Sequence, residues 1–199
     1  MKKLLSALFV LALCSSVAMA TVPDPSNCEV TPDLNNGVLI CPDNPVLLNG
    51  TTYTITVRNA DNNVIPNAAV VFELGAEIAV CTTFVDNATT DASGVATIIL
   101  RGAGCIHNQA NAAVVKANGI VIKTFNFVKS PANGGTTTNA PLESVDTSAL
   151  VAFADTFNDV VPGGTCHDYD NSGDCDTGDL PFFGDAFSNA NNCDLIGLP

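Results

Sequence analysis

Apolar and polar residues alternate in five segments between residues 50 and 129, and this alternation is the strongest local pattern in the chain. Each segment is rich in Val, Ile and Thr and is bounded by Asn, Asp or Gly, which predicts β-strands joined by turns. The segments are 53–57, 68–74, 95–100, 112–117 and 119–127. Several short strands at this spacing predict an antiparallel β-sandwich over residues 35–129, preceded by an N-terminal arm at 21–34.

A helical pattern follows the predicted sandwich. Residues 148–157 align without gaps on residues 178–187, thirty positions later. The apolar positions Leu150, Phe153 and Phe157 match Leu180, Phe183 and Phe187. The i, i+3, i+7 spacing places each trio on one face of a helix, so we expect two short helices that pack together within a unit at 142–199. Residues 130–141 lack an apolar period and predict a flexible linker.

The first twenty residues have the features of a signal peptide. Two lysines at positions 2 and 3 precede an apolar run, and Ala18 and Ala20 provide the small residues that signal peptidase requires. Cys14 follows Leu13, which does not fit a lipidation site, so we expect cleavage before Thr21. The apolar run is too short to span a bilayer, and no later segment predicts a membrane span. The protein is therefore expected to be secreted, either extracellular or at the cell surface.

Charge is distributed unevenly along the chain. The 7 basic and 20 acidic residues exclude a basic surface for nucleic acid. Residues 130–199 contain eleven acidic residues and neither Lys nor Arg. Such a block is either a solvated, self-repelling tail or a cation site, and the spacing of its acidic residues distinguishes the two.

Residues 168–179 fit a twelve-residue calcium loop in which oxygen-bearing side chains alternate around Gly173. Ca²⁺ takes six to eight hard oxygen ligands, and alternating side chains on a tight turn can converge on one ion. The predicted ligands at loop positions 1, 3, 5, 7, 9 and 12 are Asp168, Asp170, Ser172, Asp174, Asp176 and Asp179. Position 7 is expected to act through its backbone carbonyl and position 9 through water. His167, just before the loop, is expected to face solvent.

Seven of the eight cysteines follow the signal peptide, and in an exported protein they predict disulfides. Zinc is the alternative, but no pair has the C-x2-C spacing and the two histidines are scattered. The sequence leaves the connectivity open, although order and locality favour neighbouring pairs. These pairs are Cys28 with Cys41, Cys81 with Cys105, and Cys166 with Cys193.

Three segments of the predicted sandwich together resemble a known family. TITVRN at 54–59, NVIPNAAV at 63–70 and TDASGVAT at 90–97 resemble bacterial Ig-like domains of the invasin and intimin type. The resemblance implies an Ig-like sandwich that serves as a non-catalytic spacer or adhesive module on a bacterial surface. The cysteines at 81 and 105, which flank the TDASGVAT segment, depart from the family pattern.

The C-terminal repeat with its calcium loop resembles dockerin domains, which carry paired calcium loop and helix units and bind cohesins. The first unit is degenerate, because Asp146 alone keeps a ligand carboxylate and Glu143 stands where the loop needs Gly. One Ca²⁺ is therefore expected where the family usually holds two. Position 8 faces inward in such paired loops, which predicts that Val145 and Cys175 are buried and that Cys175 is a free thiol.

No nucleophile elbow, Walker loop, dinucleotide-binding glycine pattern or metalloprotease helix is present in the sequence, so we do not expect an enzyme. The predicted function is a secreted, non-catalytic binding or structural module with a calcium-stabilised C-terminus. One alternative is a fibre subunit, in which the arm at 21–46 adds a strand such as 37–41 to a neighbouring sandwich. Others are docking to a cohesin-like partner and adhesion through surface glycans or host proteins. The asparagines at 49 and 87 fit glycosylation acceptors.

Overall fold

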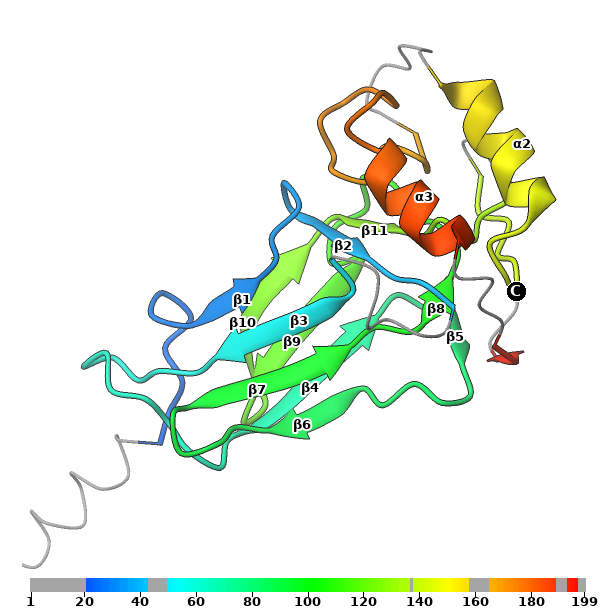
Figure 1. Cartoon of the computed structure of the whole chain (residues 1–199). Helices are drawn as coiled ribbons and strands as arrows, with labels where there is room; N and C mark the ends of the chain where they lie inside the picture. Colours follow the sequence, from blue (N-terminus) through cyan, green and yellow to red (C-terminus); the bar gives the residue numbers. More distant parts are fainter. Residues whose placement is uncertain (1–20, 43–49, 137, 158–164, 189–192, 197–199) are drawn as a thin grey trace, which may run out of the picture.

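The computed structural model describes residues 21–42, 50–136, 138–157, 165–188 and 193–196, so the predicted signal peptide lies outside the described residues. The described chain is mainly β, with several antiparallel sheets and two helices (Figure 1). This confirms the predicted mainly-β fold with a small helical part. None of the helices within these ranges is long and apolar enough to cross a membrane.

Two antiparallel sheets form the larger part of the structure (Figure 1). Their strands are β1 (Glu29–Thr31), β3 (Thr52–Thr56), β4 (Ala69–Leu74), β6 (Asn87–Thr89), β7 (Val95–Ile99), β9 (Ala113–Ala117) and β10 (Ile120–Phe125). One sheet has the order β1-β3-β7 and the other β10-β9-β4-β6. Every predicted strand segment is present with its ends shifted by a few residues, and the last one divides at Asn126 into β10 and β11 (Phe127–Lys129).

The core of the sandwich follows from the two-residue period of its strands. Alternate side chains of both sheets point inward, and Tyr53 of β3, Phe72 of β4 and Phe125 of β10 are completely buried. The ring of Phe72 lies 5.1 Å from that of Tyr53 and 6.1 Å from that of Phe125, measured between centroids. These three aromatic side chains therefore lie where the two sheets meet.

The turn before β7 is held by its own side chains. Asp91 Oδ1 accepts hydrogen bonds from the backbone N–H groups of Ser93 at 2.8 Å and Val95 at 3.0 Å. Gly94 has φ +73°, and a Cβ at this position would lie 2.8 Å from Cβ of Val64. The aspartate and the glycine of the predicted turn therefore have separate local roles.

The segment expected to be an N-terminal arm contributes to the sandwich. Strand β1, within the predicted arm at 21–34, pairs with β3, and β2 (Gly37–Leu39), at the start of the predicted sandwich, pairs in parallel with β11. Residues 37–39, which the fibre alternative would donate to a neighbour, are thus hydrogen-bonded within their own chain. The sequence did not reveal β1, and it offered 37–41 only as a strand for a neighbouring sandwich, because a segment of three residues cannot show an alternating pattern.

The two helices lie together at one end of the sandwich, close to β2 and β11 (Figure 1). Asp146 caps α2 (Thr147–Thr156) by accepting hydrogen bonds from the N–H groups at 148 and 149. Phe153 stacks on Phe183 of α3 (Leu180–Ser188), with 4.7 Å between the ring centroids. The predicted helix pair is confirmed, but Leu150 is 40% exposed and Leu180 44%, so these two members of the predicted stripes face outward.

The segment expected to be a flexible linker is packed against both parts of the chain. Ser130, Ala132 and Asn133 are fully buried. The Asn133 side chain donates to Gly135 O at 2.6 Å and accepts from Ala140 N at 2.7 Å, so it satisfies the backbone of a buried turn. A second apolar cluster joins sandwich residues with the helical unit. Its members include Leu39, Ala103, Ala132, Val145, Phe153, Tyr169, Cys175 and Phe183.

Two disulfides connect the sandwich to the C-terminal unit, Cys81 with Cys193 and Cys105 with Cys166. The predicted pairs Cys81–Cys105 and Cys166–Cys193 are therefore wrong. The tail returns to the sandwich, where β12 (Leu195–Ile196) pairs with β5 (Ala79–Cys81), which in turn pairs with β8 (Gly102–Ala103). Cys81 is the last residue of β5, where the tail pairs, and Cys105 follows β8.

The remaining predicted pair, Cys28 with Cys41, is not formed either. Cys28 Sγ accepts a hydrogen bond from Arg58 N at 3.3 Å, and Cys41 is buried in the second apolar cluster. Cys175 is a completely buried free thiol, as predicted. Val145, at the equivalent position of the first repeat unit, is buried as well.

Candidate cation site

Three aspartates converge in the loop that precedes α3. The carboxylate groups of Asp168, Asp170 and Asp179 each place one oxygen within 4.8 Å of the others. The chain bends sharply between them, with φ of +54° at Asn171 and +108° at Gly173. These aspartates occupy positions 1, 3 and 12 of the predicted calcium loop, so the local spacing of the sequence identified this cluster.

Backbone N–H groups orient the two buried carboxylates of the cluster. Asp168 accepts hydrogen bonds from Ser172 N at 2.9 Å and Gly173 N at 3.1 Å. Asp179 accepts from the N–H groups of Tyr169 and, at 3.0 Å, Asp176. The folded loop therefore fixes the positions of these oxygens before any ligand binds.

The other three predicted ligands lie outside this cluster and are exposed. Ser172 Oγ donates to the backbone oxygen of Asp174 at 3.2 Å, and Asp176 accepts from Gly178 N at 2.7 Å. The sequence assigned the backbone carbonyl of Asp174 and a water-mediated contact of Asp176, neither of which requires a side chain inside the cluster. Their assignment as ligands stays a prediction.

The site has a large electrostatic imbalance. The side chain of Asp179 is 0% exposed and that of Asp168 2%. Loss of hydration raises the pKa of Asp179 from 3.8 to about 6, although its backbone hydrogen bonds act in the opposite direction. A hard divalent cation would neutralise these carboxylates, and carboxylate oxygens are the ligands that Ca²⁺ prefers.

Lys129 is the member of the site that sequence reasoning missed. Its ammonium lies 3.4 Å from Asp168 Oδ2 and donates a hydrogen bond to the Asp168 backbone oxygen. Burial lowers the pKa of Lys129, whereas the charge of Asp168 raises it. Lys129 ends β11, thirty-nine residues from its partner. The one signal in the sequence was its place as the last basic residue before the acidic C-terminal part.

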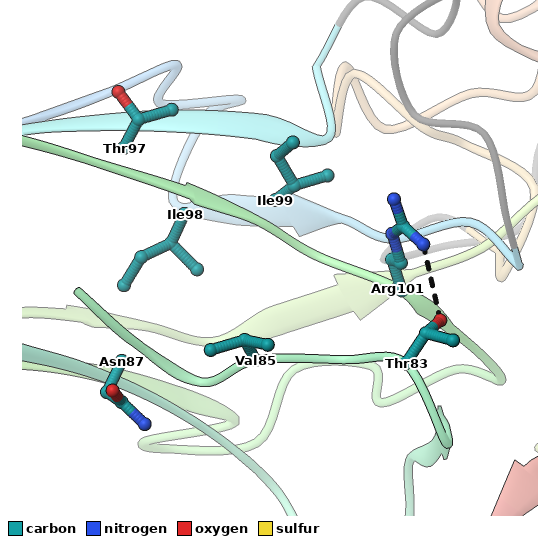
Figure 2. A pocket seen from close by; sticks show the side chains of 7 residues that line it. All are labelled: Thr83, Val85, Asn87, Thr97, Ile98, Ile99 and Arg101. Carbon is teal, nitrogen blue, oxygen red and sulfur yellow. Dashed lines mark hydrogen bonds between the residues drawn. The ribbon is translucent and has the colours of Figure 1, made fainter.

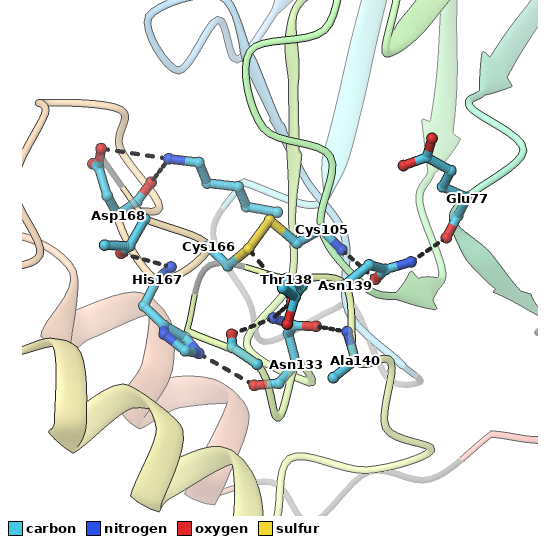
Figure 3. The surroundings of a disulfide bond; sticks show 12 residues. Glu77, Cys105, Asn133, Thr138, Asn139, Ala140, Cys166, His167 and Asp168 are labelled. Atoms are coloured by element: carbon cyan, nitrogen blue, oxygen red, sulfur yellow. Dashed lines mark hydrogen bonds and ion pairs between the residues drawn. A yellow bond between two sulfur atoms is a disulfide. The ribbon is translucent and has the colours of Figure 1, made fainter. Parts of the chain in front are cut away.

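His167 is completely buried, so the expectation that it faces solvent is wrong. Its Nδ1 lies 3.1 Å from Thr156 Oγ1 at the end of α2, and its Nε2 lies 3.2 Å from Asn133 O. Burial lowers the pKa of this imidazole. Figure 3 shows His167 beside the Cys105–Cys166 disulfide, where it links the start of the predicted calcium loop to the segment that follows the sandwich.

The loop also contacts the turn between β1 and β2. Asn35 Nδ2 donates to the backbone oxygen of Asp170 at 2.8 Å, and Asn171 Nδ2 donates to Leu34 O at 2.7 Å. Together with Lys129, these amides attach the predicted calcium loop to the sandwich at two places.

A separate groove of about 280 Å³ lies between β7 and the segment that leads into β6 (Figure 2). Thr83, Val85, Asn87, Thr97, Ile98, Ile99 and Arg101 line it. Its charged side chain, Arg101, donates to Thr83 Oγ1 at 3.2 Å. The groove lining brings no carboxylate or histidine together with Arg101, so the three-aspartate cluster remains the better candidate for a functional site.

Comparisons with known protein families, with curated proteins and with solved structures found no match for this chain. The resemblances to invasin-type Ig-like domains and to dockerins therefore stay predictions that rest on the sequence segments quoted above. The function has to be argued from the geometry of the site.

Proposed function

We propose that this protein is a secreted, non-catalytic binding or structural module whose C-terminal unit holds one Ca²⁺ in residues 168–179. The convergence of Asp168, Asp170 and Asp179 carries this proposal. Two of the three carboxylates are buried, and Lys129 supplies one positive charge against three negative ones. A divalent cation would neutralise the remainder and replace the water that the buried oxygens have lost.

The proposed role of the ion is structural. An ion that binds the folded loop and not the unfolded chain stabilises the fold according to its concentration and affinity. The loop leads directly into α3, whose Phe183 stacks on Phe153 of α2. Calcium would therefore stabilise the helix pair and its attachment to the sandwich.

Two features support an extracellular location. Two disulfides join distant parts of the chain, and such bonds persist in oxidising compartments. The first twenty residues, outside the described structure, have the pattern of a signal peptide. In the proposed protein, the sandwich acts as an Ig-like spacer or adhesive module on a bacterial surface. The helical unit acts as a dockerin-like binding module.

A protein partner for the helical unit is the second candidate function. Leu150, Val151, Leu180 and Phe187 are exposed apolar side chains on the two helices. A cohesin-like partner would cover them, and capture by the calcium-loaded chain but not by the chelated chain would support this candidate. The fibre alternative lacks such an observation, because the β2 segment is paired with β11.

The calcium proposal is tested by calorimetric titration of the purified chain, compared with thermal unfolding in calcium and in chelator. We expect one Ca²⁺ per chain and a higher melting temperature with calcium. Asp170→Asn should weaken binding by about tenfold or more, because it removes a charged ligand from the cluster. Asp174→Asn is the matched control, since it removes the same charge from the same loop, and its affinity should stay within about threefold. A wild-type chain that neither binds calcium nor is stabilised by it would refute the proposal.

A further inference from the structure

Lys129 belongs to the sandwich, yet its ammonium is buried against the candidate calcium loop. The side chain is 1% exposed, contacts both the carboxylate and the backbone oxygen of Asp168, and lies 5.4 Å from the ring centroid of Phe127. We propose that Lys129 sets the charge of the cation site and so makes it selective for a divalent over a trivalent ion. This inference rests on the proposed calcium site and names what controls its selectivity.

The charges of the site are simple to assign. Asp168, Asp170 and Asp179 contribute three negative charges, and Lys129 reduces the total to minus two. The other basic side chains after the signal peptide have partners elsewhere: Arg58 donates to Asn62 O, Arg101 to Thr83, Lys116 to Glu73 and Lys123 to Asp33. Residues 130–199 contain no Lys or Arg. For this cluster of three aspartates and Lys129, a divalent ion leaves no net charge, whereas a trivalent ion leaves one positive charge. The carboxylates of Asp174 and Asp176, which the loop also contains, are exposed and screened by solvent.

Lys129 is held in this position and cannot move away when an ion binds without losing contacts. Its hydrogen bond to the Asp168 backbone oxygen and its contact with the Phe127 ring do not involve the carboxylate. An ion bound to either oxygen of Asp168 would lie within about 8 Å of the ammonium, given Ca²⁺–oxygen distances of about 2.4 Å. The repulsion between Lys129 and the ion is thus an inherent property of the site.

The magnitude of this repulsion follows from Coulomb's law. At an effective dielectric constant of about 20, a unit charge about 8 Å away changes the affinity by about tenfold or more for each unit of charge on the ion. Removal of the Lys129 charge should therefore strengthen the binding of Tb³⁺ by about tenfold more than that of Ca²⁺. A lysine that merely held the loop in place would affect both ions alike.

The experiment measures the dissociation constants of Ca²⁺ and Tb³⁺ for the purified full chain and its Lys129→Met, Lys129→Arg and Lys116→Met variants. Terbium luminescence sensitised by Tyr169, which lies within the loop, reports Tb³⁺ binding, and competition reports Ca²⁺ binding. We expect the ratio of the Ca²⁺ to the Tb³⁺ dissociation constant to rise about tenfold in Lys129→Met. This ratio should stay within about twofold of the wild-type value in Lys129→Arg, which keeps the charge, and in Lys116→Met, which removes a remote, partly exposed charge.

An unchanged ratio in a folded Lys129→Met chain would overturn the inference, even if its metal-free form melts at a lower temperature. Should that variant fail to fold, Lys129→Gln takes its place, because the glutamine amide keeps a donor for the Asp168 backbone oxygen. The same rise in the ratio is required of it. A wild-type chain that binds neither ion refutes the calcium proposal itself, which is a different result from binding without selectivity.

Discussion

Asp179 should make the metal-free protein less stable as the pH rises through about 6. Burial raises the pKa of this carboxyl from 3.8 to about 6. The folded chain therefore holds the proton at pH values where the unfolded chain has released it. Below pH 3.8 the side chain is protonated in both states and has no effect, whereas above about pH 6 the full penalty is present.

The size of the effect follows from the two pKa values. A difference of about two units corresponds to about 3 kcal/mol in the free energy of unfolding, and about 2 kcal/mol of it develops between pH 4 and pH 7. Because the Asp179 side chain is 0% exposed, solvent screening does not reduce the penalty much. A bound cation favours the ionised carboxylate, so calcium should remove this part of the pH dependence.

Urea unfolding from pH 4 to pH 8 measures the effect in metal-free and calcium-containing buffers. The comparison with Asp179→Asn isolates this carboxyl together with its coupling to the neighbouring carboxylates, because the side chains elsewhere in the chain contribute equally to both proteins. We expect the metal-free wild type to lose about 2 kcal/mol relative to the variant between pH 4 and pH 7. Equal pH dependences for the two metal-free proteins would refute the reasoning, as would a wild-type dependence that calcium leaves unchanged.

Two further predictions concern the attachment of the C-terminal unit. Phe153→Ala should lower the free energy of unfolding by about 3–4 kcal/mol, because the ring packs between Phe183 and Tyr169. The exposed Leu150 on the same helix provides the control, and Leu150→Ala should lower it by less than about 1 kcal/mol. Equal losses for the two variants in denaturant unfolding would contradict this prediction. Replacing both Cys81 and Cys193 with Ser should cost up to about 5 kcal/mol, because their disulfide spans 112 residues. Peptide mapping of the wild type should identify the Cys81–Cys193 bond, and a Cys81–Cys105 peptide would show that the tail is not attached in this way.

The parts of the fold that were predicted have local signals. Strands of five or six residues show an alternating pattern, the two helices repeat their apolar positions, and the aspartate spacing within twelve residues marked the loop. The strands that the alternating pattern missed have two or three residues each, which is too short for a period; they are β1, β2, β5, β6, β8 and β12. What stabilises them is pairing with strands that are distant in sequence, as β12 pairs with β5.

The errors at the site have the same origin. Lys129 and His167 have no neighbours in sequence that would indicate burial, and their partners Asp168 and Asn133 are supplied by the way the tail folds back. Locality predicts the wrong cysteine pairs, because the tail returns to the end of β5 and joins Cys193 to Cys81. Asp168, Asp170 and Asp179 could be identified because one short loop brings them together.

The composition of residues 130–141 predicted a linker because Gly, Thr, Asn and Pro favour turns, but turns can be buried when side chains satisfy their backbone. Asn133 does this for Gly135 and Ala140. Two disulfides, the Lys129–Asp168 ion pair and a shared apolar cluster then cross the expected domain boundary. Because these contacts link the C-terminal unit that contains the loop to β2, β5, β8 and β11, an ion bound at Asp168 would act on the sandwich as well as on the helices. A calcium unit that moved freely on a linker would stabilise only itself.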